Sequence, residues 1–118
     1  MQSSSLECRI HDVLVEMDMP FEEEYTFDDL HSSSGRALRF DFACFDDAGN
    51  LDFLIEAQGE QHYHPVKRFG GSKGFHRQRY NDNLKRQYCN KNRIQLIAIP
   101  YFDENKVNAE YIMRAAGY

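Results

Sequence analysis

The sequence predicts one α/β domain, residues 1–118, in which a central mixed sheet of about four strands is flanked by helices in the order αβββαβα. Three observations predict this fold. Apolar residues recur at helical spacing in residues 5–18, apolar and polar residues alternate along residues 21–27, and the continuous apolar run of residues 94–99 is typical of a central, buried strand. With 118 residues, of which 42% are hydrophobic, the chain can bury one core but not two.

Helices are expected near both ends of the chain, where capping signals accompany the apolar periodicity. Ser4 and Glu7 have the spacing of a capping box in front of the first helix, and Asp103 is expected to cap a final helix over residues 104–116. On the residues alone, Glu7 is best explained as part of this cap. A carboxylate at a helix start can also project toward a sheet and bind a metal ion, so this alternative stays open.

Residues 38–45 and 51–58 predict two strands of a β-hairpin, because the residues between them have the composition of a turn. In an antiparallel pair with this turn, the numbers of facing residues sum to about 97, which sets Asp41 opposite Glu56. Two carboxylates that face each other across about 5 Å destabilise a sheet unless a cation lies between them. The alternative is that both acids lie on the solvated side of the sheet.

The densest polar chemistry lies at the end of this hairpin, in residues 55–65, which read IEAQGEQHYHP. Side chains alternate along a strand, so Glu56 and Gln58 share one face, while Gly59 lets the backbone turn. Residues 66–75 follow as a glycine-rich, basic stretch without the pattern of a phosphate-binding loop. This stretch is predicted to be a mobile loop that closes over a nucleic-acid backbone.

A helix is predicted over residues 76–91. Its inner face is expected to carry Tyr80, Leu84, Tyr88 and Cys89, which recur at helical spacing. The other faces of this helix would then carry polar and charged residues, namely Gln78, Asp82, Lys85 and Arg86.

The net charge of −5 conceals a strong segregation of charge along the chain. Residues 1–61 contain 15 acidic and three basic residues, whereas residues 67–93 contain nine basic residues and one acidic residue. A basic block of this kind suits a phosphate backbone, although it could also be a solvated helix face that balances the acidic half. The residues expected to contact nucleic acid are Lys67, Arg68, Lys73, Arg77 and Arg79.

Cysteine usage and hydropathy bear on the compartment. Cys8, Cys44 and Cys89 are odd in number and widely spaced, which predicts reduced thiols in a cytoplasmic protein. No apolar run is long enough to span a bilayer, and the acidic first 20 residues do not have the pattern of a secretory signal. We therefore expect no membrane partner.

Several motifs together resemble one family of nucleases. The strings RFDF (39–42), IEAQGEQHY (55–63), FGG (69–71), Asp82-x-x-Lys85-x-x-Tyr88-Cys89 and the apolar run up to Tyr101 are similar to the small restriction-endonuclease-like proteins of the PD-(D/E)XK superfamily. Within that superfamily the chain most resembles phage and mobile-element endonucleases related to very-short-patch-repair and EDxHD homing endonucleases. The resemblance implies a restriction-endonuclease-like core and a site that hydrolyses DNA phosphodiester bonds with Mg²⁺ or Mn²⁺.

The resemblance assigns the metal ligands position by position. Asp41 matches the strand aspartate of the family, and Glu56 matches the glutamate of its E-x-K half-motif. Glu7 matches the helix carboxylate that completes the metal shell. Carboxylate oxygens are hard ligands that suit Mg²⁺, and the bound ion would polarise the phosphate and activate water.

The remaining catalytic roles depart from the usual pattern at one position. Gln58 stands where the motif usually has lysine, so it can orient a water molecule but cannot supply a positive charge. His62 matches a histidine near the scissile phosphate and is a candidate for proton transfer, while Lys85 or a histidine would replace the missing lysine. The expected catalytic residues are Asp41, Glu56, Gln58, His62 and Lys85.

Two other classes of function stay open. A zinc site could be built from His62, His64, His76 and Cys89, although their spacings are irregular. Alternatively, the glutamine at position 58 marks lost activity, and the chain is a non-catalytic DNA-binding or interaction module on the same fold. If the chain does cut both strands of DNA, a symmetric homodimer would do so most easily.

Overall fold

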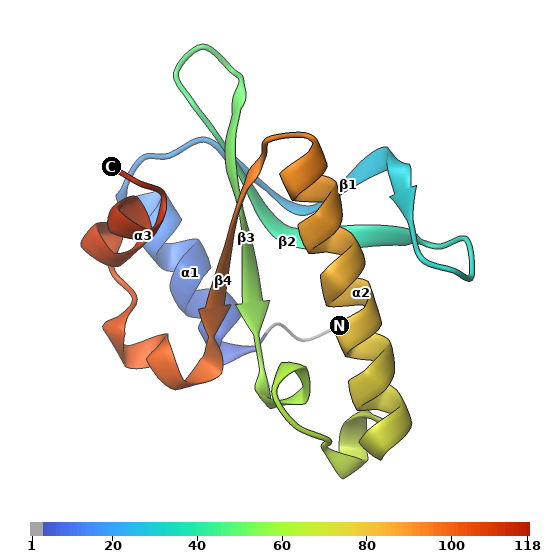
Figure 1. Cartoon of the computed structure of the whole chain (residues 1–118). Helices are drawn as coiled ribbons and strands as arrows, with labels where there is room; N and C mark the ends of the chain where they lie inside the picture. Colours follow the sequence, from blue (N-terminus) through green and yellow to red (C-terminus); the bar gives the residue numbers. More distant parts are fainter. Residues whose placement is uncertain (1–3) are drawn as a thin grey trace.

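The computed structural model describes residues 4–118 and confirms the predicted order of helices and strands (Figure 1). Within these residues, short 3₁₀ segments complete the connections. The helices are α1 (Ser5–Glu16), α2 (Gly71–Lys91) and α3 (Ala109–Ala115), and the strands are β1 (Phe21–His31), β2 (Ala37–Phe45), β3 (Leu51–Gln58) and β4 (Gln95–Pro100). The 3₁₀ segments are η1 (Glu60–His62), η2 (Lys67–Phe69) and η3 (Tyr101–Lys106).

The four strands form one mixed sheet in the order β1-β2-β3-β4. The first three strands are antiparallel to their neighbours, whereas β4 pairs with β3 in parallel, an arrangement that needs the long crossover supplied by α2. The predicted hairpin register is confirmed, because Phe42 pairs with Ile55 directly beside Asp41 and Glu56. The prediction of a central strand at residues 94–99 is wrong, since β4 lies at the sheet edge and is apolar because helices pack on both sides of it.

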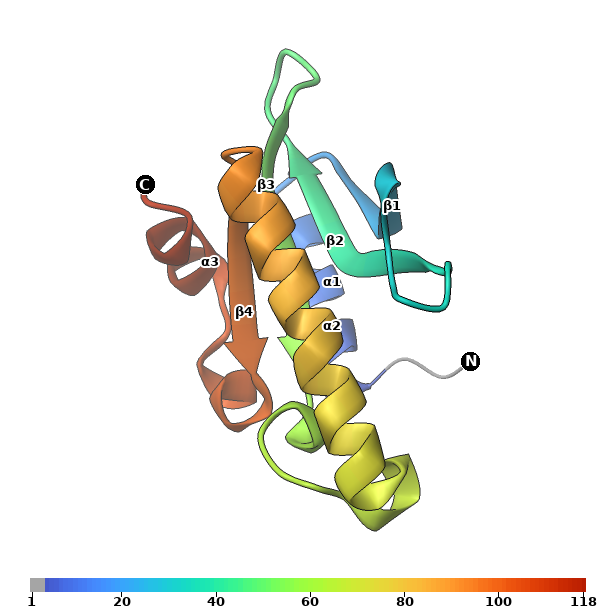
Figure 2. The same cartoon turned by 45° about the vertical axis from the view of Figure 1, so that its right-hand side comes forward.

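Helices cover both faces of the sheet (Figure 2). On one face, Ile10 of α1 and Ile112 of α3 pack against Phe42 and other strand residues. On the opposite face, Cys89 of α2 packs in a second cluster with Phe40. We call these the α1 layer and the α2 layer.

Strand β2 changes layer at Asp41. Phe40 and Phe42 would share a face in a regular strand, yet Phe40 packs in the α2 layer and Phe42 in the α1 layer. On β1, the residue across from Asp41 is Glu24, whose backbone is left-handed with φ 51°. The irregularity leaves Asp41 between the two layers, where its carboxylate turns toward β3 and accepts a hydrogen bond from the Ala57 backbone N–H at 2.7 Å.

The prediction of a loop over residues 66–75 is wrong, because most of this stretch folds into η2 and the first turn of α2. Gly70 precedes the helix with a left-handed backbone, φ 92°, which glycine adopts without steric cost. Gly74 lies inside the helix and packs so closely that a Cβ atom there would be 1.9 Å from the carbonyl oxygen of Phe69. A left-handed backbone at Gly70 and close packing at Gly74, and not loop flexibility, account for these two glycines.

The last part of the chain also differs from its predicted boundaries. Asp103 does not cap a helix, because residues 101–106 form η3. The final helix begins after Asn108, whose side chain accepts a hydrogen bond from the Tyr111 backbone N–H at 2.8 Å. The helix is therefore shorter than the predicted span of 104–116.

Two general expectations can be compared with the structure. The thiols of Cys8, Cys44 and Cys89 are free, as the sequence predicts. Among residues 4–118, no helix has the length and apolar character needed to cross a membrane.

Candidate active site

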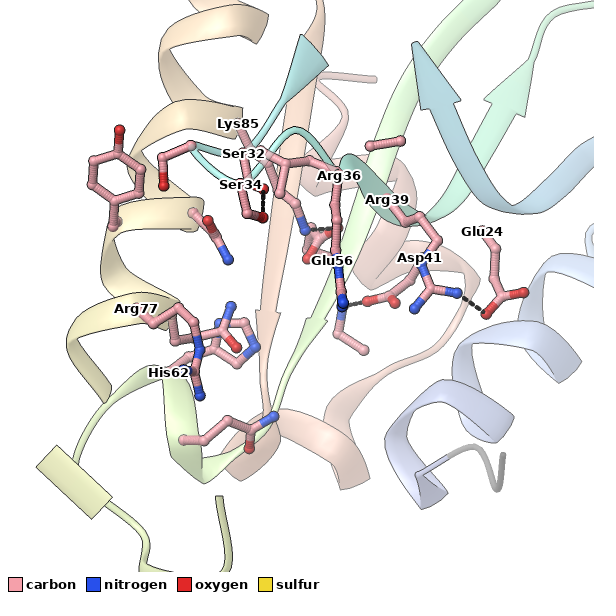
Figure 3. Close-up of a pocket in the computed structure, with 18 of the residues that line it drawn as sticks. Glu24, Ser32, Ser34, Arg36, Arg39, Asp41, Glu56, His62, Arg77 and Lys85 are labelled. Carbon is pink, nitrogen blue, oxygen red and sulfur yellow. Dashed lines mark hydrogen bonds and ion pairs between the residues drawn. The ribbon is translucent and has the colours of Figure 1, made fainter. Parts of the chain in front are cut away.

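A cleft of about 670 Å³ opens between α2 and the β1–β2 hairpin, beside the end of β3 (Figure 3). Its walls are contributed by α1, β2, β3, η1 and α2, which are far apart in the sequence. The cleft brings together most of the residues predicted to be catalytic or metal-binding, namely Glu7, Asp41, Glu56, His62 and Lys85.

A buried ion pair lies at the centre of this cleft. Lys85 Nζ donates a hydrogen bond to Glu56 Oε1 at 3.2 Å, and the two side chains are only 10% and 6% exposed. The ammonium also lies 5.4 Å from the centroid of the Phe40 ring, which places it over an aromatic face. Asp41 lies on β2, the strand adjacent to β3, so its carboxylate, that of Glu56 and the ammonium of Lys85 line the same wall of the cleft (Figure 3).

Burial and mutual repulsion perturb the carboxyl groups of the cleft. Burial raises the pKa of Glu56 to about 7; Lys85 opposes this shift, and the charge of Asp41 adds to it. Burial also raises the pKa of Asp41, and burial together with the charge of Asp41 raises the pKa of Glu7. A cation between these groups would favour their ionised forms.

His62 is held by a hydrogen-bonded chain that starts on α2. Its Nδ1 lies 2.9 Å from Asp82 Oδ2, and Gln78 Nε2 donates to the other oxygen of Asp82 at 3.1 Å. The His62 side chain is 7% exposed and that of Asp82 is 18% exposed. Since a carboxylate accepts hydrogen bonds, the proton is assigned to Nδ1, which leaves Nε2 as the atom that can exchange a proton in the cleft.

Asp41 and Glu56 are the carboxylates of the cleft that could together contribute ligands to a divalent ion, whereas Glu7 is engaged elsewhere. Among residues 4–118, no three His, Cys, Asp or Glu side chains lie close enough together to hold a metal ion. Glu7, the predicted third ligand, instead accepts a hydrogen bond from the Ser4 hydroxyl at 3.4 Å. Asp41 Oδ1 and Glu56 Oε2 accept no hydrogen bond from the described residues. One or two carboxylates with water suffice for Mg²⁺, so this pair suits it.

Gln58 does not reach the cleft. The strand ends at this residue, and its Oε1 accepts a hydrogen bond from the Tyr63 hydroxyl at 2.8 Å. The side chain lines a neighbouring pocket together with Arg86. Lys85, and not Gln58, is therefore the residue that contacts Glu56.

The cleft is lined by more arginines than the sequence predicts. Arg77 is the predicted DNA contact that lies there, while Arg36 and Arg39 face the cleft from the β1–β2 hairpin (Figure 3). Arg39 also donates to Glu24 at 3.0 Å, an exposed contact on the outer strand. The other predicted DNA contacts are exposed residues outside this cleft, namely Lys67, Arg68, Lys73 and Arg79.

The predicted inner face of α2 is confirmed except at Tyr80, and it omits Lys85. Leu84 and Tyr88 pack against the α2 layer and Cys89 is buried in it. Tyr80 is 51% exposed, whereas Lys85 is buried. Gln78 and Asp82 lie on the same side of the helix as Lys85; Gln78 donates to Asp82, and Asp82 bonds to His62. This face carries Gln78, Asp82, Lys85 and Cys89, which follow one another at intervals of four, three and four. Helical periodicity that includes polar residues would therefore have found it.

The structure also bears on the zinc alternative. The four residues proposed for zinc do not form such a site within the described part of the chain. Cys89 is buried against Phe40 in the α2 layer, and His62 bonds to Asp82. His64 lies on the outside, where its Nε2 is 3.5 Å from Glu60.

No protein-family model matches the chain, and no solved structure gives a significant match. The chain is similar to two viral proteins. Over 74 residues it is 39% identical to uncharacterized protein 094L of Frog virus 3 (isolate Goorha). This alignment covers 61% of this chain and 45% of that protein. Over 52 residues it is 42% identical to uncharacterized protein 307L of Invertebrate iridescent virus 6, covering 43% of this chain and 26% of that protein. The chain thus spans less than half the length of either relative.

Proposed function

We propose that the protein is a DNA endonuclease with a restriction-endonuclease-like core and a PD-(D/E)XK type of site that depends on Mg²⁺ or Mn²⁺. The observation that carries this proposal is the convergence of Asp41, Glu56 and Lys85 on one cleft. In the motif the lysine normally follows the glutamate on the same strand, where this chain has Gln58. Lys85 of α2 brings the missing positive charge to Glu56 from the helix that packs on the sheet.

Asp41 and Glu56 would hold the divalent ion. Bound there, it would supply Lewis-acid activation of the scissile phosphate and neutralise charge in the transition state. The two carboxylates would otherwise repel a phosphodiester, and burial already disfavours their charged forms. A cleft with these acids therefore suits a phosphate only together with a cation.

The protein's own residues account for the proton transfers and for the remaining charge. In hydrolysis, a water oxygen forms a bond to phosphorus and the water loses a proton, while the bond to the leaving oxygen breaks and that oxygen takes up a proton from solvent. His62 can accept the proton of the attacking water at Nε2 while Asp82 holds its Nδ1–H, and Lys85 lies where it can offset negative charge on the phosphate. Arg36 and Arg77, on opposite walls, would bind the flanking phosphates.

The test is a cleavage assay on supercoiled plasmid and on a synthetic four-way junction, with and without Mg²⁺ or Mn²⁺. We expect metal-dependent nicking or linearisation by the wild-type protein and its loss in Asp41→Asn and Glu56→Gln. The matched control is Asp47→Asn, which removes one carboxylate from the exposed β2–β3 turn and should cleave normally. Circular dichroism of each variant checks that it is folded.

Two results would refute the assignment. Full metal-dependent cleavage by Glu56→Gln would show that the activity does not come from this cleft. A wild-type protein that binds DNA but never cuts it, with either metal, would favour the non-catalytic DNA-binding module. The already formed contact between Lys85 and Glu56 is the observation that keeps this second function open, because it occupies one oxygen of the proposed metal ligand.

A further inference from the structure

A second groove runs on from the cleft past the end of β3. It shares Glu7, Ala57 and Gln61 with the cleft and has a volume of about 340 Å³. Two aromatic side chains, Phe69 of η2 and Tyr101 of η3, line it further along. None of the roles assigned above to the cleft uses these two rings.

Phe69 is exposed although its backbone is firmly held. The side chain is 44% exposed, which is high for a large apolar residue. Its N–H donates to Val66 O at 2.9 Å, and its carbonyl packs against Gly74, where no other residue would fit without displacement. Because the backbone at Phe69 is held, only the side-chain torsions of this exposed ring lose freedom when a flat ligand binds.

Tyr101 is a second aromatic ring with a defined position. Its ring centroid lies 5.4 Å from that of Phe102 and 5.9 Å from that of Tyr63, so neighbouring rings support it. Tyr101 is half-buried, whereas Phe69 is exposed. An exposed aromatic ring beside this cleft is suited to stacking on a nucleobase, because every base has a π face.

Both cations and carboxylates lie at this groove. The guanidinium carbon of Arg68 lies 5.0 Å from the centroid of the Phe69 ring, and Arg77 lines both the cleft and a third pocket that Phe69 also lines. These cations can hold phosphates next to the ring. The groove itself also contains carboxylates, from Glu7, Glu60 and Glu104, which would repel a phosphate but accept hydrogen bonds from the amino group of a base.

We propose that this groove binds the base of an unpaired nucleotide adjacent to the cleaved phosphate, with the base stacked on Phe69. A base that is paired within a duplex cannot present its face to a side chain, so the preferred substrate is DNA with an unpaired nucleotide and not an uninterrupted duplex. The carboxylates favour bases with an exocyclic amino group, so adenine or cytosine binds better than thymine. This inference rests on the proposed nuclease function.

The test compares a DNA duplex that carries one unpaired adenosine with the fully paired duplex of the same sequence. Fluorescence anisotropy with Ca²⁺ in place of Mg²⁺ gives the affinities, because the cleft needs a divalent ion to accept a phosphate. Cleavage with Mg²⁺ or Mn²⁺ gives the rates. We expect the wild-type protein to bind and cut the interrupted duplex better. Phe69→Ala should lose about tenfold in affinity for the interrupted duplex and little for the paired one.

Two further variants sharpen this comparison. Phe69→Tyr keeps an aromatic face and should retain the preference for the interrupted duplex. If the phenyl ring had only a structural role, Phe69→Ala would lower the affinity for both duplexes alike. Tyr118→Ala removes another exposed aromatic ring, away from the groove, and should change neither affinity. Replacing the unpaired adenosine with thymidine should weaken binding by the wild-type protein but not by Phe69→Ala.

The outcomes separate this inference from the nuclease proposal. If the wild type cuts both duplexes equally and Phe69→Ala lowers both affinities to the same extent, the base-binding groove is refuted while the nuclease proposal stands. If the wild type neither binds nor cuts either DNA, both proposals fail. Retained preference for the interrupted duplex in Phe69→Ala would also refute the role of this ring.

Discussion

Replacing Lys85 with methionine should make the stability of the protein more sensitive to high pH. The substitution keeps most of the side-chain volume but removes the ammonium that lies 3.2 Å from Glu56 Oε1. Both side chains are at least 90% buried, so solvent does not screen the interaction. The buried carboxyl group would then have to be either charged without its partner or protonated.

The size of the effect follows from the pKa of Glu56. Burial raises this pKa to about 7, even though Lys85 lowers it. A neighbouring opposite charge lowers a carboxyl pKa by about 1–3 units, so its removal raises the pKa further by this amount, equivalent to about 1.4–4 kcal/mol. Because the folded-state pKa lies above the unfolded one, stability falls as the pH rises from the unfolded pKa to the folded pKa. In the wild-type protein the decrease in the free energy of unfolding ends near pH 7. In Lys85→Met the decrease continues above pH 7, because the folded-state pKa of Glu56 is higher.

Urea unfolding followed by circular dichroism at about pH 5 and pH 9 measures this difference. Near pH 5, Glu56 is protonated in both folded proteins, so their free energies of unfolding should be similar. Near pH 9 the variant should be less stable by about 1.4–4 kcal/mol. The control is Lys73→Met, an exposed lysine on the same helix, whose effect should be small at both values. A destabilisation by Lys85→Met that is the same at both pH values would refute the reasoning.

Three further predictions test the packing. Gly74→Ala should destabilise the protein by about 1–3 kcal/mol in thermal unfolding, because the new Cβ would be 1.9 Å from the Phe69 carbonyl oxygen; the usual gain from alanine in a helix would contradict this. Asn108→Ala should cost about 1 kcal/mol by removing the cap of α3, and unchanged urea unfolding would argue against the cap. In the folded protein, Cys8 should react with a thiol reagent well before the other cysteines, which are buried with pKa values raised to about 12 and about 11. Equal rates for all three would be inconsistent with this burial.

Local patterns were sufficient to predict the strands and half of the candidate site. The alternation of side chains and the turn composition depend on neighbouring residues only, so they predict both the β2–β3 hairpin and its register. That register alone puts Asp41 next to Glu56. The resemblance to nucleases added the interpretation of these acids as metal ligands.

The other half of the site depends on how distant segments pack. Lys85 and Glu56 are 29 positions apart, and no local rule indicates which polar residue of the crossover helix meets the sheet. Apolar periodicity correctly predicts that Leu84, Tyr88 and Cys89 face the sheet, but it adds the exposed Tyr80 and omits the buried Lys85. The glycines before α2 were likewise ambiguous, because a glycine that permits a turn and a glycine that permits close packing look the same in a sequence.

The partly polar inner face of α2 has a consequence for local unfolding. Of its 21 residues, only Gly74, Lys85 and Cys89 are buried, and its apolar contacts with the α2 layer are concentrated in its second half, at Leu84, Tyr88 and Cys89. Amide hydrogens in the first half of α2 should therefore exchange with solvent through small openings, at lower free energy than those of β2 and β3. Fast hydrogen–deuterium exchange in this helix, slowed when DNA is bound, would show that the wall carrying Arg77 moves outward to admit its ligand while the sheet keeps Asp41 and Glu56 in place.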